Sequence, residues 1–168
     1  AQERGKRGGT ENVPGIAAMA AALKEACANM DENTKKVTAL RDRLIDGIAE
    51  IPHCALNGAR SPRLPGNVNF CFEGIEGESL LLLLDAKGIS ASSGSACTSG
   101  SLDPSHVLLA IGRPHEVAHG SLRLTICEDN TEEDIDYILA ELPPIVSYLR
   151  DMSPVWKDLM SGKRQFTL

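Results

Sequence analysis

One clear strand pattern decides the fold that we expect, the stretch Ser121-Leu122-Arg123-Leu124-Thr125-Ile126-Cys127. Its residues alternate between apolar and polar, which is typical of a β-strand with one face on a core. The apolar face consists of Leu122, Leu124 and Ile126, so Arg123 lies on the opposite face. An arginine there can be solvated, form a structural ion pair or bind an anion. The residue pattern alone favours the first two, because arginine is mostly exposed.

The sequence around this strand predicts an α+β domain, a small and mostly antiparallel sheet covered by helices on one face. Helical spacing and capping signals predict helices over 14–50, 78–87 and 104–111, a short turn from 114, and a helix over 132–149. Further strands are expected over 54–56, 68–72 and 89–91.

Three details of these elements are also expected from the sequence. Residues 31–33 break or bend the first helix. Pro143-Pro144 kinks or splits the last helix, because proline removes a backbone hydrogen bond. Residues 153–168 have a loose pattern and fray.

The most unusual segment is Ser92-Ser93-Gly94-Ser95-Ala96-Cys97-Thr98-Ser99-Gly100-Ser101, ten small uncharged residues around one thiol. Serine and glycine cannot bury much apolar area, so this segment predicts a mobile loop. A cysteine at the tip of such a loop is poorly placed to fill a core, where free cysteines usually lie. We therefore expect Cys97 to be a working thiol.

Composition excludes several classes of function. The chain has 168 residues, enough for one domain with a real core, and a net charge of −6 that disfavours nucleic acid. The aliphatic run 80–84 is too short to cross a membrane. Five cysteines without a CxxC pair predict a reducing cytoplasm and no metal site. The four histidines are expected on the surface rather than as general bases (His53, His106, His115 and His119).

Three stretches resemble the C-terminal part of cysteine desulfurases of the NifS/IscS type, pyridoxal-phosphate enzymes of the class-V aminotransferase family that take sulfur from L-cysteine. They are residues 2–12, 92–99 and 121–125, and residues 64–69 and 76–82 also fit. The resemblance extends to about Trp156.

The resemblance implies the small C-terminal domain of a fold-type I pyridoxal-phosphate enzyme, preceded by a long linking helix. The chain would then divide into a remnant of the cofactor-domain loop (1–13), a linking helical arm (14–50), the small domain with the cysteine loop (51–156) and a tail (157–168). A start at Ala1, without Met and with two glycine-rich turns in nine residues, also indicates truncation.

Particular residues acquire roles from this resemblance. Cys97 would attack the sulfur of L-cysteine and become a persulfide, Arg123 would bind the substrate carboxylate, and Thr10 would contact the cofactor phosphate of the other subunit of a homodimer. The sulfur would pass to an acceptor or scaffold protein in the cytoplasm, and Cys97 could transiently ligate an iron–sulfur cluster. No nucleic acid, membrane or resident metal is implied.

The sequence departs from the family in one respect. None of its lysines lies in the Ser-x-His-Lys setting that holds pyridoxal phosphate, so we expect the chain alone to be inactive. Two alternatives stay open: a non-enzymatic sulfur-relay or docking module, and an unrelated hydrolase that uses Cys97 with a histidine partner.

Overall fold

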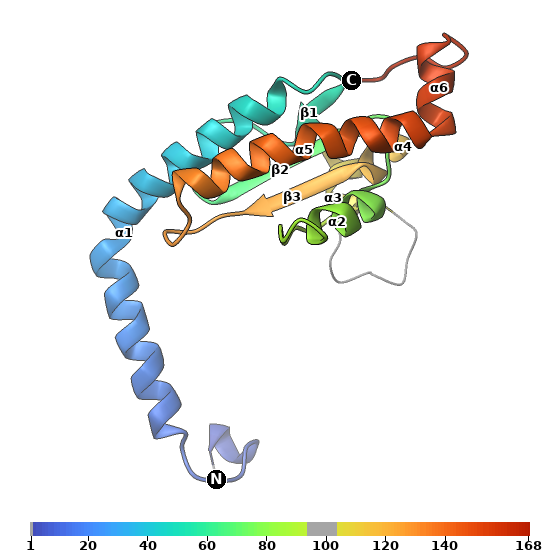
Figure 1. Cartoon of the computed structure of the whole chain (residues 1–168). Coiled ribbons are helices and arrows are strands. Elements are labelled where there is room, and N and C mark those ends of the chain that lie inside the picture. The colour runs from blue at the N-terminus through green and yellow to red at the C-terminus, as the bar shows by residue number, and fades with distance from the viewer. Residues whose placement is uncertain (1, 94–103) are drawn as a thin grey trace.

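The computed structural model describes residues 2–93 and 104–168 as a long helix that leads into a small sheet with helices on both faces (Figure 1). In chain order the elements are η1 (Glu3–Gly5), α1 (Val13–Ala49), β1 (Cys54–Leu56), β2 (Asn67–Phe72), α2 (Gly77–Asp85), α3 (His106–Ala110), α4 (His115–His119), β3 (Ser121–Thr125), α5 (Glu132–Met152) and α6 (Pro154–Met160). The expected α+β class is confirmed, but the expectation that helices cover only one face of the sheet is wrong, because α3 and α4 lie on the face opposite α1 and α5.

The sheet is antiparallel, with the strand order β1-β2-β3. Phe70 pairs with Leu122, and Val68 pairs with Leu124, so these four apolar side chains share one face. All four are buried. The face on which Arg123 lies carries the polar partners of the same strands, as the alternation predicts.

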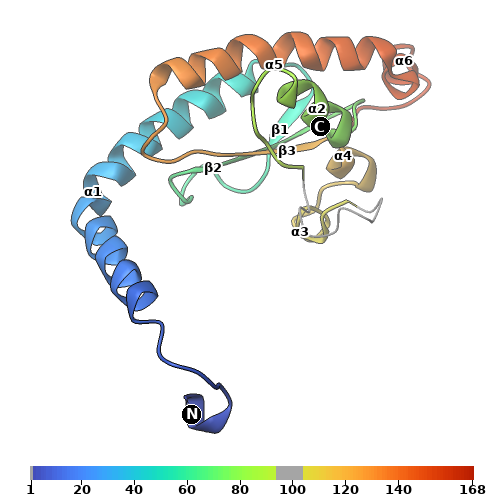
Figure 2. The same ribbon diagram turned by 60° about the horizontal axis from the view of Figure 1, so that its bottom comes forward.

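The main core lies between the apolar face of the sheet and two helices, α1 and α5, which run side by side over it (Figure 2). Leu44 and Ile48 of α1 meet Ile135 and Leu142 of α5 there. A capping box at Thr131 fixes the start of α5, because the Thr131 side chain and that of Asp134 each accept from the other's backbone N–H.

Helix α1 is continuous through residues 31–33, where the sequence predicts a break or bend. Figures 1 and 2 show a change of direction near its middle, so the bend is confirmed and the break is not. Only its second half, from Val37 onward, carries buried side chains. The first half exposes a row of apolar residues (Val13, Ile16, Met19, Leu23 and Met30). Within the described ranges, no helix combines the length and apolar character that a membrane span requires.

Helix α5 also differs from expectation, because it runs unbroken through Pro143-Pro144. Both prolines lie on its exposed side, while Leu142, Ile145 and Val146 beside them are buried. Carbonyls that lose a helical partner there can bond to water, and the buried neighbours hold the helix on the sheet. The expected split is therefore wrong.

The end of the chain is ordered rather than frayed. After α6, Phe166 stacks on His53, with 3.8 Å between the ring centroids. The buried Glu73 carboxylate accepts hydrogen bonds from the Thr167 hydroxyl at 2.9 Å and from the Leu168 N–H at 3.2 Å. These contacts fasten the last residues to the end of β2, so the prediction of a fraying tail is wrong.

Smaller differences occur around the thiol segment. Residues 89–91 form no strand, and Ser92 makes a single antiparallel bridge to Arg123. The helix expected from Pro104 begins at His106, after Ser105. Strand β3 ends at Thr125, two residues earlier than predicted.

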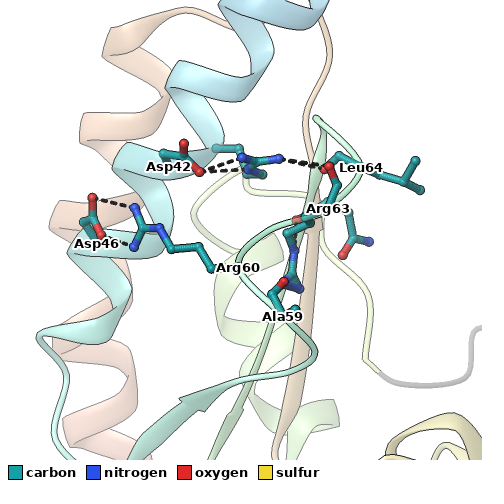
Figure 3. Close-up of polar contacts among 8 residues, drawn as sticks. Asp42, Asp46, Ala59, Arg60, Arg63 and Leu64 are labelled. Carbon is teal, nitrogen blue, oxygen red and sulfur yellow. Dashed lines mark hydrogen bonds and ion pairs between the residues drawn. The ribbon is translucent and has the colours of Figure 1, made fainter.

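The turn between β1 and β2 is tied to α1 by arginines (Figure 3). Arg41 of α1 donates to the carbonyls of Arg63 and Leu64, and Arg60 forms an ion pair with Asp46 of α1. Arg63 donates in turn to the carbonyls of Asn57, Ala59 and Asn67. The start of β2 is therefore held in a fixed position.

Candidate active site on the polar face of the sheet

Arg123 lies in the middle of β3 with a neighbour on each side. Its backbone N–H donates to the Ser92 carbonyl at 2.6 Å, and the Ser92 N–H donates to the Arg123 carbonyl at 3.0 Å. On the other side it is the register partner of Asn69 in β2. Within residues 2–93 and 104–168, no hydrogen bond or ion pair engages the half-buried guanidinium. A guanidinium without a partner among these residues is a candidate ligand for an anion.

Among the described residues, helices cover the polar face at the end where Cys71 lies. Helices α3 and α4 lie on the side of the sheet opposite α1 and α5 (Figure 2). They contribute Leu108, Val117 and Ala118 to a second buried cluster, which closes over Cys71 of β2. Asn69 and Arg123, on the same face, are only partly buried.

Next to Arg123, a chain of hydrogen bonds crosses the sheet. Arg113 donates from Nε to the Asn57 Oδ1 at 2.7 Å and from Nη2 to the Leu56 carbonyl at 2.6 Å. The Asn57 Nδ2 donates to the Asn69 Oδ1 at 2.6 Å and contacts the Cys71 sulfur at 3.1 Å. These hydrogen bonds could not be predicted from the sequence pattern, although the alternation of β2 places Asn69 on the polar face.

The predicted nucleophile, Cys97, lies outside the described residues. Ser92, which bridges to Arg123, precedes it by five positions in the sequence. Two other cysteines are poor nucleophiles: burial raises the pKa of Cys54 to about 11, and it also raises the pKa of Cys71. Cys27 and Cys127 are exposed free thiols.

Thr10 lies far from this site in the same chain. It is exposed and precedes α1, at the end of the helix that is remote from the sheet (Figure 1). The structure therefore does not bring Thr10 together with Arg123. A role for Thr10 at a cofactor requires a second subunit, as the family resemblance implies.

The histidines differ in their surroundings. His106 and His115 are exposed, as expected, and His119 is half-buried with its ring 4.7 Å from that of His115. The surface expectation is wrong for His119 and also for His53, which is half-buried at a backbone φ of +53°. Its Nδ1 lies 3.6 Å from the Glu73 Oε2, which has no hydrogen-bond partner among the described residues.

The lysines of this chain do not fit pyridoxal phosphate. All seven are exposed, whereas a lysine that forms a Schiff base needs a site that lowers its pKa. Lys87 shows the opposite effect, because its hydrogen bond and ion pair with Glu141, at 2.9 Å, raise its pKa. None of the seven lysines of this chain is therefore suited to attach the cofactor.

The centre of the candidate site is thus a small antiparallel sheet with Arg123 on its polar face, where the guanidinium has no partner among the described residues. Comparison with known proteins gives the class of the protein. Residues 2–138 match the family described as aminotransferase class-V, and the chain belongs to this family. Enzymes of this family that are cysteine desulfurases generally depend on pyridoxal phosphate.

Within the family, the chain is similar to cysteine desulfurases. It is 59% identical over 167 residues to cysteine desulfurase IscS of Clostridium botulinum, covering 98% of this chain and 42% of that protein. It is 50% identical over 156 residues to cysteine desulfurase NifS of Azotobacter vinelandii, covering 92% of this chain and 39% of the relative. A solved NifS-like protein superimposes with a TM-score of 0.75 at 34% identity, over 88% of this chain and 37% of that one. The chain thus spans about two fifths of these relatives.

Proposed function

We propose that this chain supplies the substrate-carboxylate and sulfur-accepting part of a pyridoxal-phosphate-dependent cysteine desulfurase. The observation that carries the proposal is the guanidinium of Arg123, which is half-buried on the polar face and has no partner among the described residues. The backbone bridge between Ser92 and Arg123 sets the first residue of the thiol segment beside the backbone of Arg123. A carboxylate binds an arginine fork with two parallel hydrogen bonds, which fixes the position of the substrate.

The proposed reaction converts L-cysteine and the Cys97 thiol into L-alanine and a Cys97 persulfide. The Cys97 thiolate forms a bond to the substrate sulfur while the carbon–sulfur bond breaks, and the carbon takes up a proton. Pyridoxal phosphate supplies the electron sink for this cleavage when it is bound. Arg123 holds the carboxylate, and Cys97 accepts the sulfur. Because no lysine here fits the cofactor, we propose that the chain alone is inactive.

The division of the chain and its partners follow from the same proposal. Residues 1–13 belong to the cofactor-domain loop, 14–50 to the linking arm, 51–156 to the small domain and 157–168 to the tail. Thr10 contacts the cofactor phosphate of the other subunit in a homodimer. The persulfide passes to an acceptor protein. The four cysteines within the described ranges are free thiols, which supports a reducing cytoplasm.

A chimera tests the nucleophile. This chain replaces the matching segment of the Clostridium botulinum desulfurase, and the product is treated with L-cysteine and mapped by peptide mass spectrometry without reductant. We expect one added sulfur atom on Cys97 in the unsubstituted chimera and no added sulfur atom in the Cys97→Ser variant. The matched controls, Cys27→Ser and Cys127→Ser, remove exposed thiols and should keep the persulfide.

Two results would contradict the proposal. One is a persulfide that survives in Cys97→Ser and maps to another cysteine. The other is a chimera that binds the cofactor and releases alanine but carries no persulfide on Cys97.

A further inference from the structure

We propose that Asn69 is a second ligand for the substrate carboxylate and acts beside Arg123. This inference rests on the proposed function, because it assigns a further residue to the same substrate site. It is carried by two observations, the register of β2 on β3 and the direction of the hydrogen bonds that reach Asn69.

The register places the two side chains close together. The backbone N–H and carbonyl of Arg123 both bond to Ser92, so they point away from β2. The Asn69 carbonyl accepts from the Asn57 N–H at 2.8 Å, so it points away from β3. Asn69 and Arg123 are therefore a non-hydrogen-bonded antiparallel pair, the kind whose Cα atoms approach to about 4.5 Å with side chains on one face.

The hydrogen bonds fix the orientation of both amides. A guanidinium only donates, so the contact from Arg113 requires the oxygen of Asn57 at that position. The Asn57 NH₂ group must then face Asn69, which presents its own oxygen. Oxygen and nitrogen lie on opposite sides of an amide carbon. The Asn69 NH₂ group therefore faces away from β1, on the Arg123 side.

That NH₂ group is available to a ligand. It makes no hydrogen bond to any residue that the structure describes, whereas the Asn69 oxygen is satisfied by Asn57. This series of hydrogen bonds begins at the positively charged side chain of Arg113, and each bond polarises the next. The Asn69 N–H groups are therefore stronger donors. An arginine fork with a neighbouring amide donor matches a carboxylate, which has about four acceptor positions.

In the first experiment, the ¹⁵N-labelled chain is titrated with L-alanine, which is the proposed product and has the same carboxylate as L-cysteine. A parallel titration uses L-alaninamide, which has no carboxylate. We expect the side-chain resonances of Asn69 NH₂ and Arg123 Nε–H to shift with L-alanine only.

The Asn69→Asp variant keeps an acceptor for Asn57 but removes the donor and sets a negative charge beside Arg123. We expect it to weaken L-alanine binding by roughly tenfold or more, with no fall in the urea midpoint.

The matched control is Asn67→Asp, which adds the same charge to the same face two residues away, opposite Thr125. It should weaken binding less than Asn69→Asp does. In the chimera, Asn69→Asp should raise KM for L-cysteine by a similar factor, while the urea midpoint again does not fall.

The outcomes separate the two proposals. If Arg123 responds to L-alanine but Asn69 does not, and Asn69→Asp binds as well as the unsubstituted chain, the role of Asn69 is overturned and the proposed function stands. An equal loss in Asn69→Asp and Asn67→Asp also overturns it, because charge alone would then explain the effect. If neither Asn69 nor Arg123 responds, and Arg123→Ala leaves KM unchanged in the chimera, the proposed substrate site itself is contradicted.

Discussion

The two faces of the sheet are made from the same strands, but one face packs in the core and the other carries the candidate site. On one face Phe70 packs against Leu122 in the main core. One residue further along, Asn69 and Arg123 lie together on the polar face. Strand alternation alone separates them, so a stable core and a polar site are built only one residue apart.

The difference shows what each face requires of the sequence. The core face needs apolar volume, and similar side chains could fill it. The polar face needs the register itself, because a slip of one residue would send Arg123 into the core and Leu122 to the surface. The arginines that fasten the β1–β2 turn to α1 help to hold that register. Substitutions on the two faces should therefore affect different quantities.

The largest effect is expected on the core face. Phe72 is fully buried in β2, so Phe72→Ala leaves a cavity and should lower the free energy of unfolding by about 3–5 kcal/mol. Urea denaturation followed by circular dichroism measures this change. The matched control is Leu64→Ala, just before the same strand, where the side chain is 76% exposed and the change should stay within about 0.5 kcal/mol. Equal losses in both variants would show that this face is not the core.

A smaller effect concerns Cys54, at the start of β1. Burial raises the pKa of Cys54 to about 11, above its ordinary value near 9, so the folded chain keeps this proton in a range where the unfolded chain loses it. The free energy of unfolding should therefore fall as pH rises from about 9 to 11. Cys54→Ala removes this contribution, so urea midpoints at pH 8.5 and 10.5 should differ less in the variant. A steeper fall in the variant would contradict the shift.

Much of the fold could be predicted from the sequence, because its signals are local. Short windows of sequence are enough to recognise the alternation in β2 and β3 and the apolar stripes of α1 and α5. The ordered end of the chain could not be predicted in this way. It depends on Glu73, which binds Thr167 across 94 positions of sequence, and on the stacking of His53 with Phe166.

The site could be predicted only in part, because some of its residues follow a local pattern and others depend on contacts that are distant in sequence. Alternation correctly placed Arg123 on the face away from the core, but the sequence alone favoured a structural or solvated role. Asn69 was missed because its orientation depends on Arg113, which reaches Asn57 across 56 positions. The roles of Cys97 and Thr10 come from family resemblance and stay predictions.

The most direct test of the account is Arg123→Ala, measured in two ways. The guanidinium has no partner among the described residues, so the urea midpoint of the variant should match that of the unsubstituted chain. In the chimera, loss of a charged hydrogen-bond donor to the carboxylate should raise KM for L-cysteine by about 10- to 150-fold. A lowered midpoint with an unchanged KM would contradict the account and make Arg123 a structural residue.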